Sequence, residues 1–314
     1  MDPIITFPLL GDLALSFPSY FTLFGHTFYW YGAIIACGFL LAVWYCFSRC
    51  RGFGLTQDDL LDVVLFAVPI AIVGARAYYV IFYGNYDNFW DMCKIWEGGL
   101  AIYGGVIAAV ITIFVVCAVK KISPFATLDI AAFGLLIGQS VGRWGNFTNR
   151  EAFGYETDIF CRMGLTYADG STVYVHPCFL YESLWNAVGL LVMHILSKKT
   201  KRRFDGQYFL YYIGWYGLGR VWIEGLRTDS LYIGTLRVSQ ILAGVCVIAA
   251  ALILFFKLRS GTCTPERLFV NRRAAAEAAE AEACVPAEAE TGDTDEGRAS
   301  AETAPGCDGA PDGE

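Results

Sequence analysis

The chain consists of long apolar runs separated by short polar connections. Seven runs approach the roughly 20 residues that a helix needs to cross about 30 Å of hydrocarbon. They lie at Phe28–Phe47, Leu60–Phe82, Leu100–Val119, Phe125–Val141, Pro177–Leu196, Gln207–Ile223 and Val238–Phe256. The fourth and sixth are short and continue directly into charged sequence. The pattern predicts an all-α, polytopic membrane protein with about seven transmembrane helices.

Basic residues follow every second run. Arg49 and Arg51 follow the first, Lys120 and Lys121 the third, 198–203 the fifth, and Lys257 and Arg259 the last. Short loops rich in Lys and Arg stay on the cytoplasmic side of a membrane. The N-terminus is therefore expected outside and the C-terminus in the cytoplasm.

Composition agrees with a membrane body and adds a tail. Hydrophobic residues make up 56% of the chain and charged residues 17%, with a mean hydropathy of +0.46. The formal charge of −7 comes from residues 274–314, where twelve acidic residues stand against one basic residue. We expect a transmembrane catalytic domain over 1–262 and an acidic, disordered cytoplasmic tail over 263–314. Residues 1–25, with three prolines and many aromatic residues, are expected to lie at the membrane interface.

Eleven cysteines do not indicate a disulfide framework, because several, among them Cys37, Cys46, Cys117 and Cys246, lie inside apolar runs where cysteine behaves as a small hydrophobe. One bridge between Cys93 and Cys161 is an open alternative, since both fall in segments placed outside. No metal or cofactor motif is apparent.

Ionisable residues gather at the outer level of the predicted helices. Arginine and carboxylate groups at membrane depth are costly unless they are paired or functional. Each one alone could be a structural ion pair, but several polar residues accompany them, among them Gln139 and Asn149. Together they indicate a functional site. The charged members are Arg76, Arg143, Arg220, Arg227, Glu151, Glu182, Glu224 and Asp229.

The densest part of this set is Gly142–Gly154, directly after the fourth run. Its glycines are expected to end the helix and to open an outer loop over about 142–176. Arg143 and Asn146 supply donors that suit a phosphate group, so the stretch indicates a lipid headgroup site. Two shorter pieces accompany it, one from His176 to Glu182 and one from Gly219 to Asp229.

These motifs resemble the bacterial prolipoprotein diacylglyceryl transferase family. The resemblance runs from about Phe28 to Phe256. It rests on Gly142–Gly154, on Trp30-Tyr31-Gly32 and Gly74-Ala75-Arg76, on the segment from His176 to Glu182, and on Arg220, Glu224 and Arg227. The same seven-helix topology with an outer N-terminus is implied by the family.

The resemblance implies a reaction at the outer face of the bacterial plasma membrane. The diacylglyceryl group of phosphatidylglycerol passes to the thiol of the lipobox cysteine of a prolipoprotein, and glycerol phosphate is released. This is the first step of lipoprotein maturation. The partners implied are phosphatidylglycerol, prolipoprotein signal peptides and membrane lipid, with no nucleic acid and no cofactor.

Residue roles follow from this implied reaction. The expected catalytic residues are Arg143, Arg220, Glu151, Tyr103 and His176. The expected substrate-binding residues are Arg143, Asn146, Gly154, Tyr31, Arg76, Glu182, Glu224 and Arg227. Arg143 and Arg220 are the first choices for the phosphate, because guanidinium forks match phosphate oxygens.

One position departs from the family. Many members have His-Gly-Gly in the third run, whereas this chain has Tyr103-Gly104-Gly105. A tyrosine is a poor base at its reference pKa of about 10. Glu151 and His176 are the other candidates for the base, and an arginine field that lowers the pKa of the substrate thiol is a further alternative.

Two other classes of function compete. A transporter for an anionic solute would use the same arginines, but would place ionisable groups through the bilayer or at both faces. A membrane scaffold would explain the acidic tail but not the outer cluster.

Overall fold

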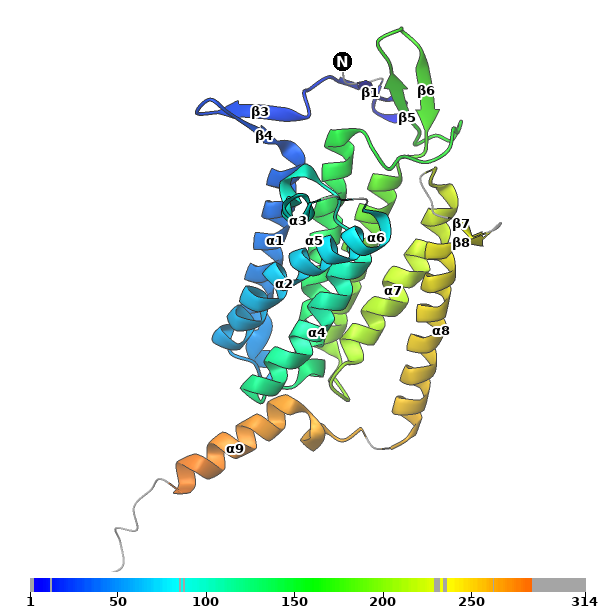
Figure 1. The fold of residues 1–314 in the computed structure, drawn as a ribbon. Coiled ribbons are helices and arrows are strands. Elements are labelled where there is room, and N and C mark those ends of the chain that lie inside the picture. The colour runs from blue at the N-terminus through cyan, green and yellow to red at the C-terminus, as the bar shows by residue number, and fades with distance from the viewer. Residues whose placement is uncertain are drawn as a thin grey trace, which may run out of the picture. The chain divides into compact units, whose positions relative to one another are not determined.

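The computed structural model describes residues 3–11, 13–84, 86, 88–228, 232–233, 236–261 and 263–283. The chain divides into two compact units, 1–275 and 276–314. In the first unit, every predicted apolar run forms a helix (Figure 1). These helices are α1 (Trp30–Arg49), α2 (Gln57–Tyr83), α4 (Ile102–Lys120), α5 (Pro124–Asn149), α6 (Cys178–Lys199), α7 (Gln207–Ile223) and α8 (Val238–Arg259).

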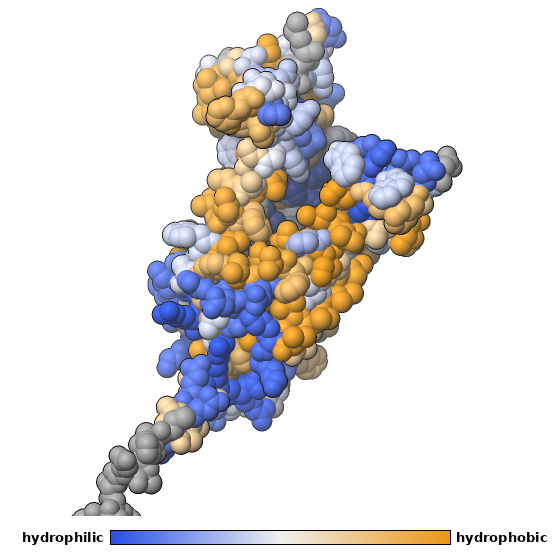
Figure 2. Space-filling model, turned by 60° about the vertical axis from the view of Figure 1, so that its left-hand side comes forward, coloured by the Kyte–Doolittle hydropathy of each residue, from blue (hydrophilic) through white to orange (hydrophobic). Residues whose placement is uncertain are grey.

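Six of these helices are long and apolar enough to cross a membrane, one fewer than predicted. The exception is α7, whose 17 residues extend about 26 Å. Large side chains on the membrane-length helices are exposed, for example Leu40 at 66% and Val73 at 66%. Figure 2 shows a broad apolar region across the middle of one face, with hydrophilic residues below it. The protein is a multi-pass membrane protein.

The helices pack mainly in pairs, α2 with α4, α1 with α5, α5 with α6, and α7 with α8. Glycines allow the closest approach, between α2 and α4. A Cβ at Gly104 would lie 2.3 Å from both the Gly74 carbonyl oxygen and the Cβ of Tyr78. Only glycine fits at such a crossing.

Small sheets at one end correct the all-α prediction. A four-stranded antiparallel sheet has the order β2 (Leu13–Leu15), β1 (Ile4–Phe7), β5 (Met163–Thr166) and β6 (Thr172–Val175). Two hairpins pair β3 (Tyr20–Leu23) with β4 (His26–Tyr29), and β7 (Tyr232–Ile233) with β8 (Leu236–Arg237). Ile5 is fully buried against Leu165, Val175 and Phe179. The segment expected to lie along the interface therefore contributes three strands, β1, β2 and β3, to these sheets.

Short helices complete the described fold. They are η1 (Pro8–Leu10), η2 (Cys50–Phe53), α3 (Phe89–Cys93), η3 (Ile95–Glu97), η4 (Glu224–Leu226), η5 (Pro265–Arg267) and α9 (Phe269–Ala283). Cys93 and Cys161 are both free, so the bridge left open by the sequence is absent.

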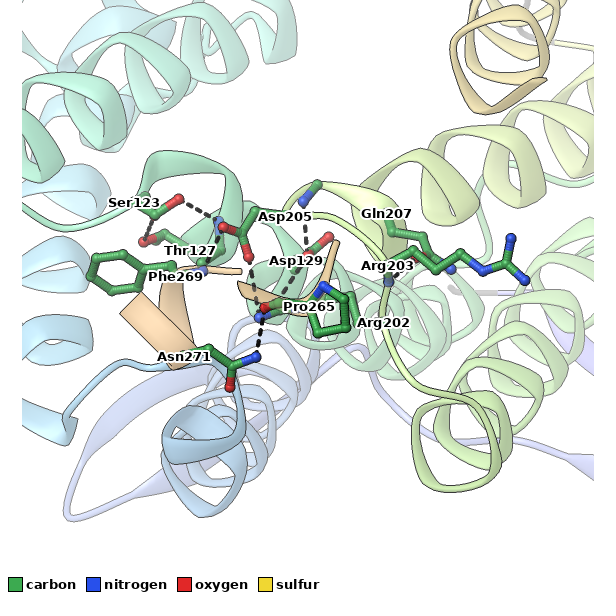
Figure 3. Close-up of polar contacts among 12 residues, drawn as sticks. Ser123, Thr127, Asp129, Arg202, Arg203, Asp205, Gln207, Pro265, Phe269 and Asn271 are labelled. Atoms are coloured by element: carbon green, nitrogen blue, oxygen red, sulfur yellow. Dashed lines mark hydrogen bonds and ion pairs between the residues drawn. The ribbon is translucent and has the colours of Figure 1, made fainter. Parts of the chain in front are cut away.

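A buried charged cluster lies at the end of the bundle remote from the four-stranded sheet. Asp129 of α5 is 0% exposed and accepts hydrogen bonds from Arg202 at 3.1 Å and from the backbone amides of Gly206 and Phe209 at 2.9 and 3.0 Å. Arg202 also pairs with Asp205 at 3.2 Å (Figure 3). A buried ion-pair cluster therefore lies at this end of the helices too, whereas the sequence had suggested clustered charges at membrane depth only at the outer end.

The chain after α8 returns to this cluster. The Phe269 amide at the start of α9 donates to Asp205 at 2.9 Å, and Arg273 pairs with Asp59 at 2.8 Å. Leu268 is buried. Residues 265–275 are thus ordered against the helix ends, although the tail was expected to be disordered from about Thr264. Residues 276–283 continue α9, and 284–314 of the predicted tail lie outside the described residues.

Candidate functional site

Glu182 is the centre of an ion-pair network at the sheet end of the bundle. It lies in the second turn of α6, a helix that begins directly after Pro177. Its side chain is 5% exposed and pairs with Arg143 of α5. Arg220 of α7 and Arg227, which follows η4, each donate to the same carboxylate at 3.1 Å. Three elements distant in sequence therefore meet at one buried acid.

A second carboxylate completes the network. Arg220 pairs with Glu224 at 2.8 Å, one helical turn away, and Glu224 is 2% exposed. In the described contacts, three guanidinium groups therefore meet at two buried carboxylates. Such a site suits an additional anion. Asp229, predicted to belong to this set, lies outside the described residues.

Helix α5 does not end at Gly142, as the sequence had suggested, but continues to Asn149. Its glycines serve packing, because a Cβ at Gly145 would lie 2.8 Å from the ring of Tyr31. The helical spacing places Arg143 and Asn146 on one face, where Arg143 donates to the Asn146 amide oxygen at 3.4 Å. Asn146 in turn donates to Glu151 at 2.9 Å. The predicted residues of this stretch therefore form one connected chain.

Arg150 explains where α5 ends, a role that no local sequence pattern indicates. It adopts a left-handed conformation, with φ of 55°, and its guanidinium is buried. It donates to the carbonyl oxygens of Pro3 at 2.7 Å and of Thr148 at 2.9 Å. Arg150 thereby fastens the N-terminal segment over the end of α5.

Gly154 permits a close backbone approach. Its amide donates to the His176 carbonyl at 2.9 Å, and it forms an isolated bridge with Arg227. A Cβ there would lie 2.7 Å from both the Leu226 carbonyl oxygen and the His176 Cβ. The contacts assign Gly154 to holding Arg227 in position.

His176 lies beside this junction rather than in the arginine network. Its Nδ1 is 3.4 Å from the Tyr181 hydroxyl, which also lies 3.4 Å from the Cys161 sulfur. Burial lowers the pKa of His176 below its ordinary value. The imidazole is therefore neutral near pH 7.

Arg76 and Tyr103 lie apart from the network in the described contacts. Arg76 is buried and donates to the backbone carbonyls of Met92 at 2.8 Å and Gly98 at 2.6 Å, and also to those of Asp91 and Gly99. This pattern fits an anchor for the segment between α2 and α4. Tyr103 packs beside the ring of Tyr78, with 6.5 Å between centroids.

A cavity of about 610 Å³ opens beside Arg143. Tyr31, Gln139, Arg143 and Asn146 line its polar end, and apolar residues of α1, α2 and α5 line the rest as far as Leu60. Its lining spans α5 from Thr127 to Asn146, about 28 Å along the helix. A polar end is therefore continuous with a long apolar chamber, a combination that suits an amphipathic ligand.

Across the described residues, no group of three or more His, Cys, Asp or Glu side chains is placed to hold a metal ion.

Comparison with known proteins agrees with this geometry. A sequence model of the family described as prolipoprotein diacylglyceryl transferase matches residues 18–256, which include the network and the cavity. The chain belongs to this family. Membership decides against the transporter and scaffold alternatives, and it makes the chain a transferase.

Curated relatives of the prolipoprotein diacylglyceryl transferase family are similar over most of the chain. Proteins named phosphatidylglycerol–prolipoprotein diacylglyceryl transferase include one from Bacillus cytotoxicus, 43% identical over 78% of this chain and 92% of its own length. The protein of that name from Bacillus licheniformis is 44% identical over 74% of this chain and 89% of its own. The one from Streptococcus equi subsp. equi is 41% identical, with 74% and 91% covered.

Proposed function

We propose that the chain transfers the diacylglyceryl group of phosphatidylglycerol to the thiol of the lipobox cysteine of prolipoproteins. The thiolate sulfur attacks the carbon of the diacylglyceryl group that carries the phosphate ester. A C–S bond forms, the C–O bond breaks, and glycerol phosphate leaves with that oxygen. The observation that carries the proposal is the position of Arg143, which lines the 610 Å³ cavity and belongs to the ion-pair network centred on Glu182.

Arg143 and Asn146 are proposed to bind the phosphate of the lipid. Both line the cavity, and Arg143 is held by Glu182, a carboxylate that also holds Arg220 and Arg227. The guanidinium groups stabilise the second negative charge that develops on the phosphate as glycerol phosphate leaves. Arg220 and Arg227 act on the phosphate through the electrostatic field of their positive charges. Tyr31 lines the headgroup end of the cavity.

The acyl chains are proposed to occupy the apolar part of the cavity. Its lining extends about 28 Å along α5, whereas one leaflet contributes about half of the 30 Å hydrocarbon thickness. The chamber is therefore long enough for the chains of a lipid whose headgroup lies at Arg143.

Activation of the thiol is assigned first to the arginine field. A thiol has a pKa of about 8.5, and nearby guanidinium groups lower it toward neutral pH. Among the candidate bases, the contacts favour Glu151, because Asn146 connects it to Arg143. His176 is directed to Tyr181, and Tyr103 packs beside Tyr78.

The site is proposed to face outward across the bacterial plasma membrane, with all seven long helices crossing. Arg49, Lys120 and Arg202 make contacts at the opposite end of the bundle, with Ser197, Asp59 and Asp129 respectively. The rule that basic loops stay inside therefore places the Glu182 network outside. The acidic tail is assigned to the cytoplasm and takes no part in the reaction.

Reconstituted vesicles test the proposal. Wild-type protein in phosphatidylglycerol liposomes should lipidate a lipobox peptide, whereas Arg143→Ala should lower turnover at least 100-fold, the loss typical for one charge-stabilising donor. Lys94→Ala is a matched control, since this partly exposed cation also lies at the sheet end of the bundle and pairs only with partly exposed carboxylates. Near-normal turnover by Arg143→Ala would remove the proposed site.

A further inference from the structure

A second polar cavity lies at the end of the bundle opposite the Glu182 network. It measures about 460 Å³ and lies where α6 ends, α7 begins and the chain leaves α8. Its lining includes Lys201, Arg202, Arg203 and Gln207 from the connection between α6 and α7, and Leu258 and Pro265 from the other side. It shares no lining residue with the 610 Å³ cavity.

Two of the three cations in this lining face outward. Arg202 is buried and engaged by Asp129 and Asp205. Lys201 and Arg203 are exposed, and the side chain of Arg203 extends away from that cluster (Figure 3). The backbone amide of Arg203 donates to the side-chain oxygen of Gln207 at 2.8 Å. This hydrogen bond holds the Arg203 backbone in place beside the cavity. The mouth of the cavity is therefore positively charged.

The charge continues around the mouth. Lys198, Lys199, Lys257 and Arg259 occupy the last turns of α6 and α8, the two helices that flank the cavity. Asp205, an acid of the connection between α6 and α7, accepts from the Phe269 amide and pairs with Arg202. Asp205 is therefore directed at Arg202 and the start of α9 rather than at Lys201 or Arg203.

An apolar groove continues from this basic mouth into the membrane-spanning region. Leu196 and Tyr211 line both the mouth and a groove of about 330 Å³ between α6, α7 and α8. The groove is lined by Val192, Leu218, Ala251 and other apolar residues. Gly214 contributes to its depth, because a Cβ there would meet no atom within 4 Å.

We infer that this basic mouth and groove bind an anionic phospholipid from the leaflet opposite the Glu182 network. Lys201 and Arg203 hold its phosphate, and one acyl chain lies in the groove between α6, α7 and α8. Basic pockets between transmembrane helices recognise anionic headgroups in this way. The groove identifies the ligand as a lipid rather than a soluble phosphate. The inference does not depend on the proposed reaction, since the two cavities are separate.

Photo-crosslinking in liposomes tests this inference. The full-length protein is labelled with phosphatidylglycerol that carries a diazirine on one acyl chain, and labelled peptides are mapped by mass spectrometry. We expect labels on groove residues such as Val192 and Ala251. At subsaturating probe, Lys201→Gln with Arg203→Gln should lower groove labelling roughly 10- to 30-fold, since each cation near the surface contributes about one factor of five.

Three comparisons decide the outcome. Arg51→Gln with Lys121→Gln, a matched loss of two exposed charges from η2 and the end of α4, which line neither the mouth nor the groove, should leave groove labelling within twofold. Gly214→Leu should remove it by filling the groove, while labelling of the 610 Å³ cavity persists. A zwitterionic diazirine lipid should label the groove at least fivefold less. Equal labelling by both lipids, equal losses in the two double variants, or displacement by free glycerol phosphate would overturn the inference.

Discussion

Replacing Glu182 by glutamine probes the network more sharply than removing any one arginine. The amide has nearly the shape of the carboxylate but no charge. It would remove one of the two carboxylates at which the three guanidinium groups meet, and so raise the net charge of the network by one. Because the Glu182 side chain is 5% exposed, solvent cannot replace the lost partner.

The magnitude follows from the burial. Removing one partner of a buried ion pair typically costs about 3–5 kcal/mol. For a domain of this size each kcal/mol lowers Tm by about 2–4 °C, so Glu182→Gln should melt roughly 6–20 °C below wild type. Turnover should fall as well, since Arg143 loses the group that holds it beside the cavity.

Thermal unfolding in detergent and turnover in liposomes measure both effects. Glu97→Gln is the matched control, because Glu97 is exposed and pairs with Lys94 only at 3.5 Å, so its Tm should not change measurably. Combining Glu182→Gln with Arg227→Gln restores the original net charge of the network and should recover part of the lost Tm. If Glu182→Gln melts within about 2 °C of wild type and turns over normally, the Glu182 charge does not hold the three arginines together.

Two further predictions concern residues outside the network. Tyr103→Phe should keep turnover within about threefold of wild type, because the ring packs beside Tyr78 and the lost hydroxyl removes about one hydrogen bond at most. A loss of turnover above about 100-fold would instead give that hydroxyl a role in proton transfer. Burial lowers the pKa of His176, so the unfolded chain takes up this proton at a higher pH than the folded chain. Stability should therefore fall as the pH drops below about 6.5, and this slope should be smaller in His176→Gln; identical slopes in Tm against pH would contradict it.

The helices could be predicted from the sequence because each is a local property of an apolar run. All seven runs are helical, and the basic residues after alternate runs lie at one end of the bundle. The sheets could not be predicted from the sequence, because β1 has four residues and pairs with β5, some 160 positions later. No local pattern reveals such a partner.

The candidate site was predicted in part. Arg143, Arg220, Arg227, Glu182 and Glu224 do converge, as expected from charges at one membrane depth. The continuation of α5 past Gly142 was missed, since glycines that pack against a neighbouring helix look in sequence like glycines that end one.

Residues bound to distant backbone were harder to interpret. Arg76 was expected at the substrate, yet it donates to four carbonyl groups of residues 91–99. Arg150 was not singled out, yet it fastens the N-terminal segment. Asp129 was hidden inside an apolar run, and its partner Arg202 lies 73 positions later.

The most direct test of the proposed function is a structure of the protein with phosphatidylglycerol bound. The proposed function predicts the lipid phosphate within hydrogen-bonding distance of Arg143 and Asn146, with acyl chains in the 610 Å³ cavity between α1, α2 and α5. A phosphate far from Arg143 and Arg220, with this cavity empty of lipid, would contradict it.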